Sequence, residues 1–204
     1  MVLGLGSGST VNFMLEELKK RIQNGLNISG IPTSKKTEKL ANSYHIPLTN
    51  FEKHEEVDLA IDGADKVDKD FNLIKGGGGS LLREKIVAST AKQVVIIVDH
   101  SKIVNQFKNV TLPVEVVPFA WIQVYRQISN MGAKIVLRKS GDNIFSSDND
   151  NYILDCTFPY IKNPKQLHSM LKMMVGVVET GLFIDMADYL IISNKNTIEI
   201  KNRN

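Results

Sequence analysis

The sequence predicts an α/β fold, with helices on both faces of a mostly parallel sheet and a smaller α+β unit inserted into it. Short apolar runs rich in β-branched residues alternate with helical patterns through the first half of the chain, which is typical of βαβ units. The pattern changes near residue 112, and a buried-strand pattern returns at residues 187–192. We therefore expect a Rossmann-like domain over residues 1–111 and 179–204 and a ferredoxin-like α+β subdomain over residues 112–178.

The elements of the first domain follow from hydrophobic patterning. Val2 to Leu5 is typical of a strand, and apolar residues at three- and four-residue spacings from Val11 to Ile22 predict an amphipathic helix. That helix is expected to end near Gly25. The later apolar runs predict strands at 27–31, 57–62 and 94–98 and helices at about 34–44 and 81–92.

The inserted unit is expected to begin between two prolines, Pro113 and Pro118, which bracket its first strand. Residues 142–151 are rich in Asp and Asn and predict an exposed turn between two strands. The predicted elements of this unit are strands at 114–117, 133–138 and 151–156 and helices at 119–130 and 164–173. Strands at 187–192 and 197–200 would then return the chain to the first sheet.

The composition excludes several classes of protein. Hydrophobic residues make up 43% of the 204 residues and charged residues 23%, which is typical of a globular protein. The formal net charge is only +3 and no long basic run is present, so we expect no nucleic-acid partner. No apolar stretch approaches the roughly 20 residues of a membrane helix, and the N-terminus lacks signal-peptide features. The single cysteine, Cys156, cannot form an internal disulfide, which favours a cytoplasmic protein.

The first segment that predicts chemistry is Gly4-Leu5-Gly6-Ser7-Gly8-Ser9-Thr10, between a strand and a helix. The dinucleotide fingerprint would require glycine at position 9, which is serine, and the Gly-Lys-Ser/Thr ending of a phosphate loop is absent. Hydroxyls beside free N–H groups at a helix start suit a small terminal phosphate. The alternative is a structural turn in which Ser9 or Thr10 caps the helix.

A second segment, Ile61-Asp62-Gly63-Ala64-Asp65, places two carboxylates three residues apart at the end of an apolar strand. Ligands of open α/β sheets bind at the carboxyl ends of the strands. An Asx-turn is the structural alternative, and it explains one of the two aspartates but not readily both.

A third segment joins Lys75 to four consecutive glycines, Gly76 to Gly79, and to a helix that contains Glu84 in its first turn. Such glycines let the backbone approach a ligand closely, and a cation beside them favours an anion. The alternatives are a flexible linker for the glycines and a favourable interaction with the helix dipole for Glu84.

Two weaker signals complete the set. Asp99-His100-Ser101-Lys102 follows the strand at 94–98, where Lys102 could either bind a phosphorylated substrate or be a solvated surface lysine. The four histidines are scattered without a metal-ligand spacing, so we expect neither a zinc site nor a catalytic triad.

Taken together, these segments resemble the A-type ribose-5-phosphate isomerases over nearly the whole chain and in the same order. The resemblance implies interconversion of ribose 5-phosphate and ribulose 5-phosphate in the pentose phosphate pathway, without cofactor or metal, by a homodimer or a dimer of dimers. The matching blocks are Gly-Ser-Gly-Ser-Thr at 6–10, Thr33-Ser34 with Thr37-Glu38-Lys39-Leu40, Asp-Gly-Ala-Asp at 62–65, Lys-Gly-Gly-Gly at 75–78, Leu-Arg-Glu-Lys at 82–85, Ser101-Lys102 and Leu-Pro-Val-Glu-Val at 112–116.

The resemblance also implies roles for single residues. Glu84 matches the base that moves a proton between C1 and C2 through an enediolate. Asp62 is expected to open the sugar ring, Asp65 to position hydroxyls, and Lys75 with the glycine amides to stabilise the oxyanion. The positions that match substrate contacts are Ser7, Gly8, Ser9, Thr10, Asp62, Gly63, Ala64, Asp65, Lys75, Gly76, Gly77, Gly78 and Lys102.

The sequence departs from the family pattern in two places. Members usually begin with a helix ahead of the first glycine loop, which this sequence does not offer, and they commonly have Glu where Lys66 follows Asp65. We predict that Lys66 points away from the site and leaves catalysis intact.

Two rival functions remain open at this point. A non-catalytic sugar-phosphate sensor would keep the pocket and lack turnover. A dinucleotide-binding oxidoreductase would need an acidic ribose-binding residue about 20 residues beyond the first loop, and residues 27–34 offer none.

Overall fold

The computed structural model describes residues 1–194 and 197–203, and the chain divides into two units. Unit 1 consists of Met1–Ala64, Arg83–Lys102 and Met186–Asn204. Unit 2 consists of Asp65–Leu82 and Ile103–Asp185. The domain limits expected from the sequence, after residues 111 and 178, therefore both fall within unit 2.

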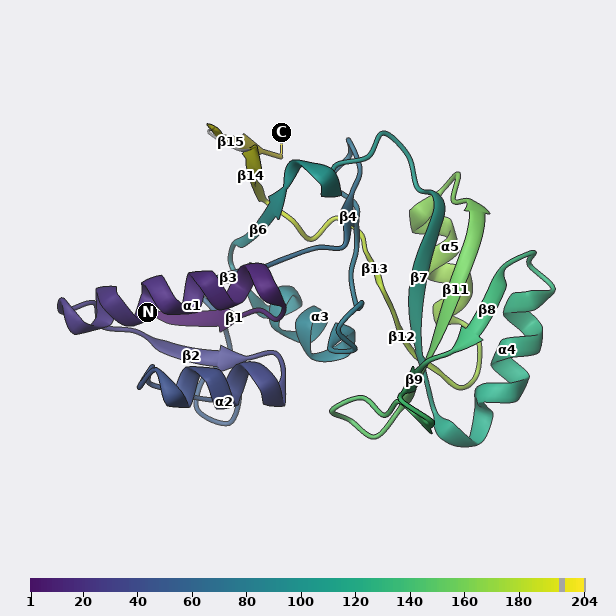
Figure 1. Ribbon diagram of the computed structural model, residues 1–204, viewed down its shortest axis with the longest axis horizontal. Coiled ribbons are helices and arrows are strands. Elements are labelled where there is room, and N and C mark those ends of the chain that lie inside the picture. The colour runs from purple at the N-terminus through teal and green to yellow at the C-terminus, as the bar shows by residue number, and fades with distance from the viewer. Residues whose placement is uncertain (195–196, 204) are drawn as a thin grey trace. The chain divides into compact units, whose positions relative to one another are not determined.

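Unit 1 is built on a six-stranded sheet with the order β15-β14-β6-β3-β1-β2 (Figure 1). Every pair of neighbouring strands is parallel except β14 and β15, which form an antiparallel hairpin at one edge. The strands are β1 (Val2–Leu5), β2 (Ser29–Pro32), β3 (Leu59–Asp62), β6 (Val94–Asp99), β14 (Tyr189–Asn194) and β15 (Thr197–Asn202). The predicted return of the chain to the first sheet is confirmed.

Helices cover both faces of this sheet, because neighbouring residues of a strand point to opposite faces. Leu3 and Leu5 of β1 belong to one apolar cluster with Val11 and Leu15 of helix α1 (Ser9–Gln23). Gly4 lies between them and faces Val87 of helix α3 (Leu81–Thr90) on the other side. Helix α2 (Lys35–Ser43) follows β2. The predicted α/β class is therefore confirmed.

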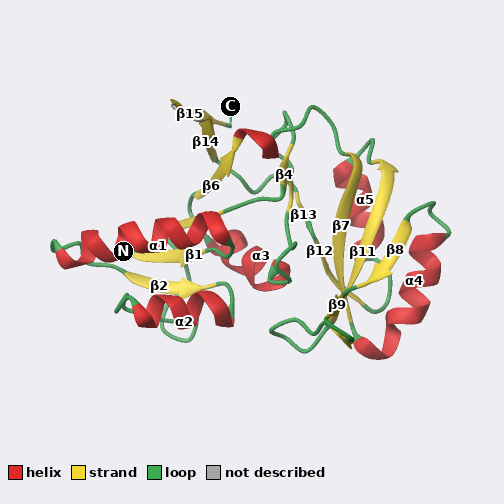
Figure 2. Cartoon of the chain, viewed as in Figure 1, coloured by secondary structure: helices red, strands yellow, loops and turns green. Residues whose placement is uncertain are grey.

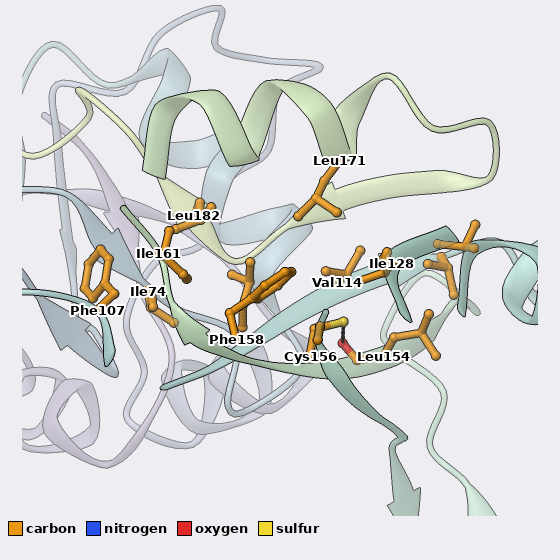
Figure 3. Packing of buried hydrophobic residues seen from close by; sticks show 14 residues of the cluster. Ile74, Phe107, Val114, Ile128, Leu154, Cys156, Phe158, Ile161, Leu171 and Leu182 are labelled. Carbon is orange, nitrogen blue, oxygen red and sulfur yellow. Dashed lines mark hydrogen bonds between the residues drawn. The ribbon is translucent and has the colours of Figure 1, made fainter. Parts of the chain in front are cut away.

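Unit 2 contains a four-stranded antiparallel sheet with the order β12-β7-β11-β8. Its strands are β7 (Lys108–Val116), β8 (Lys134–Leu137), β11 (Tyr152–Tyr160) and β12 (Val177–Thr180), and its helices are α4 (Trp121–Ser129) and α5 (Pro164–Lys172). Alternate residues of β7 and β11, such as Val114 and Leu154, pack with Ile128 and Leu171 of the helices (Figure 3). Cys156 lies in the same core, where burial raises the pKa of its thiol to about 12.

Shorter elements complete unit 2, and Figure 2 shows how much loop lies between them. They are the three-stranded sheet of β13 (Leu182–Phe183), β5 (Leu73–Ile74) and β4 (Lys66–Val67), the hairpin of β9 (Lys139–Ser140) and β10 (Asn143–Ile144), and the 3₁₀ turn η2 (Pro118–Ala120). A second 3₁₀ turn, η1 (His100–Lys102), belongs to unit 1. Within the described residues, none of the helices has the length and apolar character that a membrane crossing requires.

Several element limits differ from the expectations. Strand β7 begins at Lys108 rather than at residue 114, because its exposed polar start gives no apolar signal and Pro113 disfavours an internal strand position. Strands β4, β5 and β13 were not expected, since two residues are too few for a periodic pattern, and the four-residue strand β12 was also not expected. The predicted exposed turn at 142–151 contains β10 and the buried Ser147.

Candidate active site

The first glycine loop joins the end of β1 to the start of α1 in unit 1. Gly8 occupies the N-cap position of α1 and offers no side-chain hydrogen bond, so neither Ser9 nor Thr10 is the cap. Ser9 and Thr10 are instead the first two residues of the helix, and both are exposed. This loop therefore presents two hydroxyls and the first N–H groups of a helix, which together favour an anion.

The hydroxyl of Ser7 takes part in a cluster of side-chain hydroxyls that supports this loop from within unit 1. Its Oγ lies 2.8 Å from Thr33 Oγ1, 2.9 Å from Ser34 Oγ and 3.1 Å from Thr37 Oγ1. Thr37 Oγ1 also donates to the carbonyl of Gly6 (2.9 Å), and Thr33 Oγ1 donates to the carbonyl of Leu5 (3.0 Å). Thr33 and Thr37 belong to blocks that match the resembled family, but the sequence alone assigned them no function. Their hydrogen bonds show that they position the loop.

Asp62 joins the end of β3 to the same loop. The Oδ1 atom of Asp62 accepts hydrogen bonds from the amides of Ser7 (3.0 Å) and Gly63 (2.7 Å), and Asp62 is only 7% exposed. A Cβ atom on Gly6 would lie 2.6 Å from the Cα of Asp62, so the close approach of the two segments requires glycine there. Asp62 thus accepts the amide of the next residue, whereas an Asx-turn would bind the amide two residues on, and the same oxygen also contacts the expected phosphate loop.

Glu84 lies in the first turn of α3, and its residue is only 6% exposed. A carboxylate removed from water in this way costs free energy unless neighbouring groups compensate, and burial of this kind is common at catalytic positions. The side chain is therefore not in open solvent, which is a condition that the sequence-based assignment of a base required.

Lys102 lies in η1, immediately after β6, and is half-buried. Asp99 shapes this turn, because its Oδ1 accepts the Ser101 amide hydrogen bond at 2.8 Å. Hydrogen bonds from the side chain and the amide of Ser101 hold the pKa of Asp99 below its ordinary value. The turn thus carries an ionised aspartate that stabilises its shape.

The glycine-rich segment belongs to unit 2 and follows β5. Lys75 is 4% exposed, its amide donates to the carbonyl of Gly181 (2.9 Å), and its Nζ lies 5.4 Å from the ring centroid of Phe183. Asp65 Oδ2 accepts the amide of Gly77 at 2.8 Å, so the second aspartate of the pair binds the glycine-rich loop. Asp65 and Asp62 therefore make contacts to different loops.

A cavity of about 300 Å³ in unit 2 is lined by Asp65, Lys66 and Gly77 together with Arg138 and Asp155. The sequence interpretation did not select Arg138 or Asp155. Lys66 lines the same cavity as Asp65. That Lys66 leaves catalysis intact stays a prediction. In the part of the chain that the structure describes, no group of three or more His, Cys, Asp or Glu side chains could hold a metal ion.

Comparisons with known proteins match the chain to one family. The family described as ribose 5-phosphate isomerase A (phosphoriboisomerase A) matches residues 29–197. A ribose-5-phosphate isomerase A from Bacillus mycoides (strain KBAB4) is 48% identical over 200 residues, which cover 98% of this chain and 90% of that protein.

Solved structures give the same result. The ribose 5-phosphate isomerase A of Methanocaldococcus jannaschii superposes with a TM-score of 0.94 at 37% identity, over 99% of this chain and 91% of that one. A D-ribose-5-phosphate isomerase in complex with phospho-erythronic acid superposes with a TM-score of 0.96 at 35% identity, over 100% of this chain and 91% of that one.

Proposed function

Because the chain belongs to the ribose 5-phosphate isomerase A family, we propose that Glu84 is the catalytic base of its aldose–ketose isomerisation. The enzyme interconverts ribose 5-phosphate and ribulose 5-phosphate. In the direction of the ketose, a base removes the proton from C2, the C–H electron pair forms the C1–C2 double bond of an enediolate, and the π electron pair of the C1 carbonyl moves onto O1. The same base then returns the proton to C1, while O1 gains a proton and O2 loses one to become the ketose carbonyl, so one carboxylate serves both proton transfers at carbon. We assign this reaction to the non-oxidative branch of the pentose phosphate pathway.

The observation that supports Glu84 is its burial at the start of α3, directly after the glycine-rich segment. A carboxylate at this position is accessible to little water, which strengthens its electrostatic interactions with a bound substrate.

Residues of unit 1 are proposed to hold the phosphate and to open the sugar ring. The exposed hydroxyls of Ser9 and Thr10 and the amides from Gly8 onward would bind the phosphate at the start of α1. The hydroxyl of Ser7 is engaged in the cluster with Thr33, Ser34 and Thr37, so its role is to shape the loop. Lys102 adds a positive charge for the same anion, and Asp62 is the proposed acid or base for ring opening.

Residues of unit 2 are proposed to stabilise the developing negative charge on the oxygens of C1 and C2. Lys75 supplies the cation, and the amides of Gly76, Gly77 and Gly78 supply hydrogen-bond donors. Asp65 positions the loop through the Gly77 amide, in addition to contacting substrate hydroxyls. Gly63 and Ala64 of unit 1 are also proposed to contact the sugar phosphate.

The decisive test of this proposal replaces Glu84 by Gln. Glu84→Gln should lower kcat by about 10²- to 10⁴-fold, the usual contribution of general acid–base catalysis. It should also abolish exchange of the C2 proton with D2O, while calorimetric binding of ribose 5-phosphate and the thermal midpoint change little. Glu16→Gln, which alters an exposed glutamate of α1, is the matched control and should keep full activity.

Near-normal turnover of Glu84→Gln would assign the base to another residue. A wild-type protein that binds ribose 5-phosphate without forming ketose would instead indicate the sensor function.

We also propose that the chain forms a homodimer or a dimer of dimers in the cytoplasm. Phe119, Met173 and Val175 of unit 2 are 99%, 84% and 90% exposed, and large exposed apolar side chains commonly mark interaction surfaces. The single cysteine is compatible with a reducing compartment. Light scattering on the purified protein measures the number of chains directly.

A further inference from the structure

Unit 2 contains a pair of charged side chains to which the proposed reaction assigns no role. Arg138 follows β8, and Asp155 lies on β11, where it pairs with Val136 of β8. The Nε and Nη2 atoms of Arg138 both donate to the carboxylate, with an Nε to Oδ2 distance of 2.9 Å. The side chains are only 13% and 22% exposed, so water screens this bidentate pair weakly.

The remaining donor of Arg138 binds the glycine-rich loop. Its Nη1 donates to the carbonyl of Gly76 at 2.8 Å and to the carbonyl of Gly77 at 3.1 Å. The guanidinium also lies 5.7 Å from the ring centroid of Phe145. The arginine is thus held by a carboxylate and an aromatic ring while it binds two consecutive carbonyls.

These contacts determine which way two peptide groups of the loop face. The peptide between Gly76 and Gly77 is bound at both ends, because Arg138 binds its carbonyl and Asp65 accepts its N–H at 2.8 Å. In the next peptide, Arg138 binds the carbonyl of Gly77. A trans peptide is planar, so the N–H of Gly78 points away from the arginine.

The N–H of Gly78 has no acceptor within the described residues, and the space that a side chain at Gly78 would occupy is open. A Cβ atom built on Gly78 would meet nothing within 4 Å, and the residue is exposed. Consecutive glycines have many alternative conformations, so this orientation requires outside contacts to persist. Arg138 contacts both peptides, alongside Asp65 and the Gly79 N–H, which donates to the Gly76 carbonyl at 3.0 Å.

We propose that Arg138 and Asp155 are a positioning pair that directs the Gly78 N–H at the developing oxyanion of the substrate. The inference rests on the proposed function, because it assumes that the glycine-rich loop stabilises the enediolate. Arg138 acts through the loop and does not itself touch the substrate. Lysine is a poor substitute, since a single ammonium lacks the planar fork that binds a carboxylate and two carbonyls together.

The test compares Arg138→Lys with the double variant Arg138→Met/Asp155→Leu. Loss of one oxyanion donor typically costs about 10²- to 10³-fold in kcat, and we expect a loss in this range for the double variant and about 10-fold for Arg138→Lys. KM for ribose 5-phosphate should change less than about 3-fold, because the ground-state carbonyl needs this donor less than the enediolate does. Lys139→Met, at an exposed neighbouring cation, is the matched control and should behave as wild type.

Phospho-erythronic acid provides a readout that a purely structural role would not change. Its carboxylate imitates the charged oxygens of the enediolate, so its affinity should fall in parallel with kcat in both variants. An apolar pair commonly replaces a buried ion pair without loss of stability, so the thermal midpoint of the double variant should remain near that of wild type. If the double variant does not fold, Arg138→Lys decides the question by the same measurements.

Unchanged kcat in Arg138→Lys and the double variant would overturn the proposal, as would parallel losses in kcat, substrate affinity and thermal midpoint. Failure of the underlying function has a different signature, because wild-type protein would then form no ketose or Glu84→Gln would retain turnover.

Discussion

The two glycine-containing loops that are proposed to bind substrate, one in each unit, are held in different ways. The first loop, from Gly6 to Thr10 in unit 1, is supported by a cluster of hydroxyls, by the backbone of β3 and by one carboxylate, that of Asp62, which accepts the Ser7 amide. The glycine-rich loop, from Lys75 to Gly79 in unit 2, is supported mainly by acidic and basic side chains, namely Asp65 and the Arg138–Asp155 pair.

This difference follows the chemistry proposed for each loop. The phosphate keeps its charge throughout the reaction, so a rigid support made mostly of hydroxyls is sufficient to bind it equally in the ground and transition states. The oxygens of C1 and C2 gain charge in the transition state, and oriented charges and dipoles stabilise such a change strongly. The first loop should therefore govern substrate affinity, and the second should govern kcat.

The largest expected effect tests the backbone support of the first loop. Gly6→Ala would place a Cβ atom 2.6 Å from the Cα of Asp62, where a strand backbone cannot move aside easily. We expect a loss of about 2–3 kcal/mol in the free energy of unfolding, as in other overpacked sites, measured by urea denaturation. Gly63→Ala is the control, because its Cβ would meet only one atom, at 3.8 Å. Equal stability of the two variants would show that the backbone of β3 moves easily enough to accommodate the added methyl group.

An intermediate effect tests the hydroxyl support of the same loop. Thr37→Val keeps the side-chain shape and removes the donor to the Gly6 carbonyl, which is buried. We expect about 1–2 kcal/mol of lost stability and a higher KM with little change in kcat. Thr37→Ser retains the hydroxyl and should stay close to wild type. A loss confined to kcat would contradict the division of roles between the loops.

The smallest expected effect tests the support of the second loop by side-chain ends. In Gly77→Ala the new Cβ would lie 2.9 Å from Asp65 Oδ1, and this carboxylate can rotate away and release the Gly77 amide. We expect a loss of about 1 kcal/mol in the free energy of unfolding, less than for Gly6→Ala. Gly78→Ala should not change stability, since its Cβ would meet nothing within 4 Å. A larger loss at Gly77 than at Gly6 would reverse the comparison.

The sequence was a good guide to the parallel sheet and a poor guide to the short strands of unit 2. Runs such as Val94 to Val98 contain enough apolar residues for a clear pattern, and β6 forms there. The two-residue strands β4, β5 and β13 have no period of their own. Pairing with neighbouring strands creates them, so only the folded chain could reveal them.

The same contrast applies to the proposed site. Glu84, Asp62 and the glycine loops could be selected in advance, because their residue types follow strands or begin helices within a few positions. Arg138 had no such local signal, since it follows a strand of the inserted unit among ordinary charged residues. Its contact with the Gly76 carbonyl joins residues 62 positions apart.

The sequence by itself determined the fold class, the family and the segments that carry the chemistry, because hydrophobic periods and glycine motifs are local properties of a chain. Only the tertiary structure decided how the loops are supported. The hydroxyl contacts of Ser7 join residues 26 to 30 positions apart, and Arg138 acts over 62. Contacts of this range depend on where each strand lies in its sheet, and no pattern of neighbouring residues encodes that.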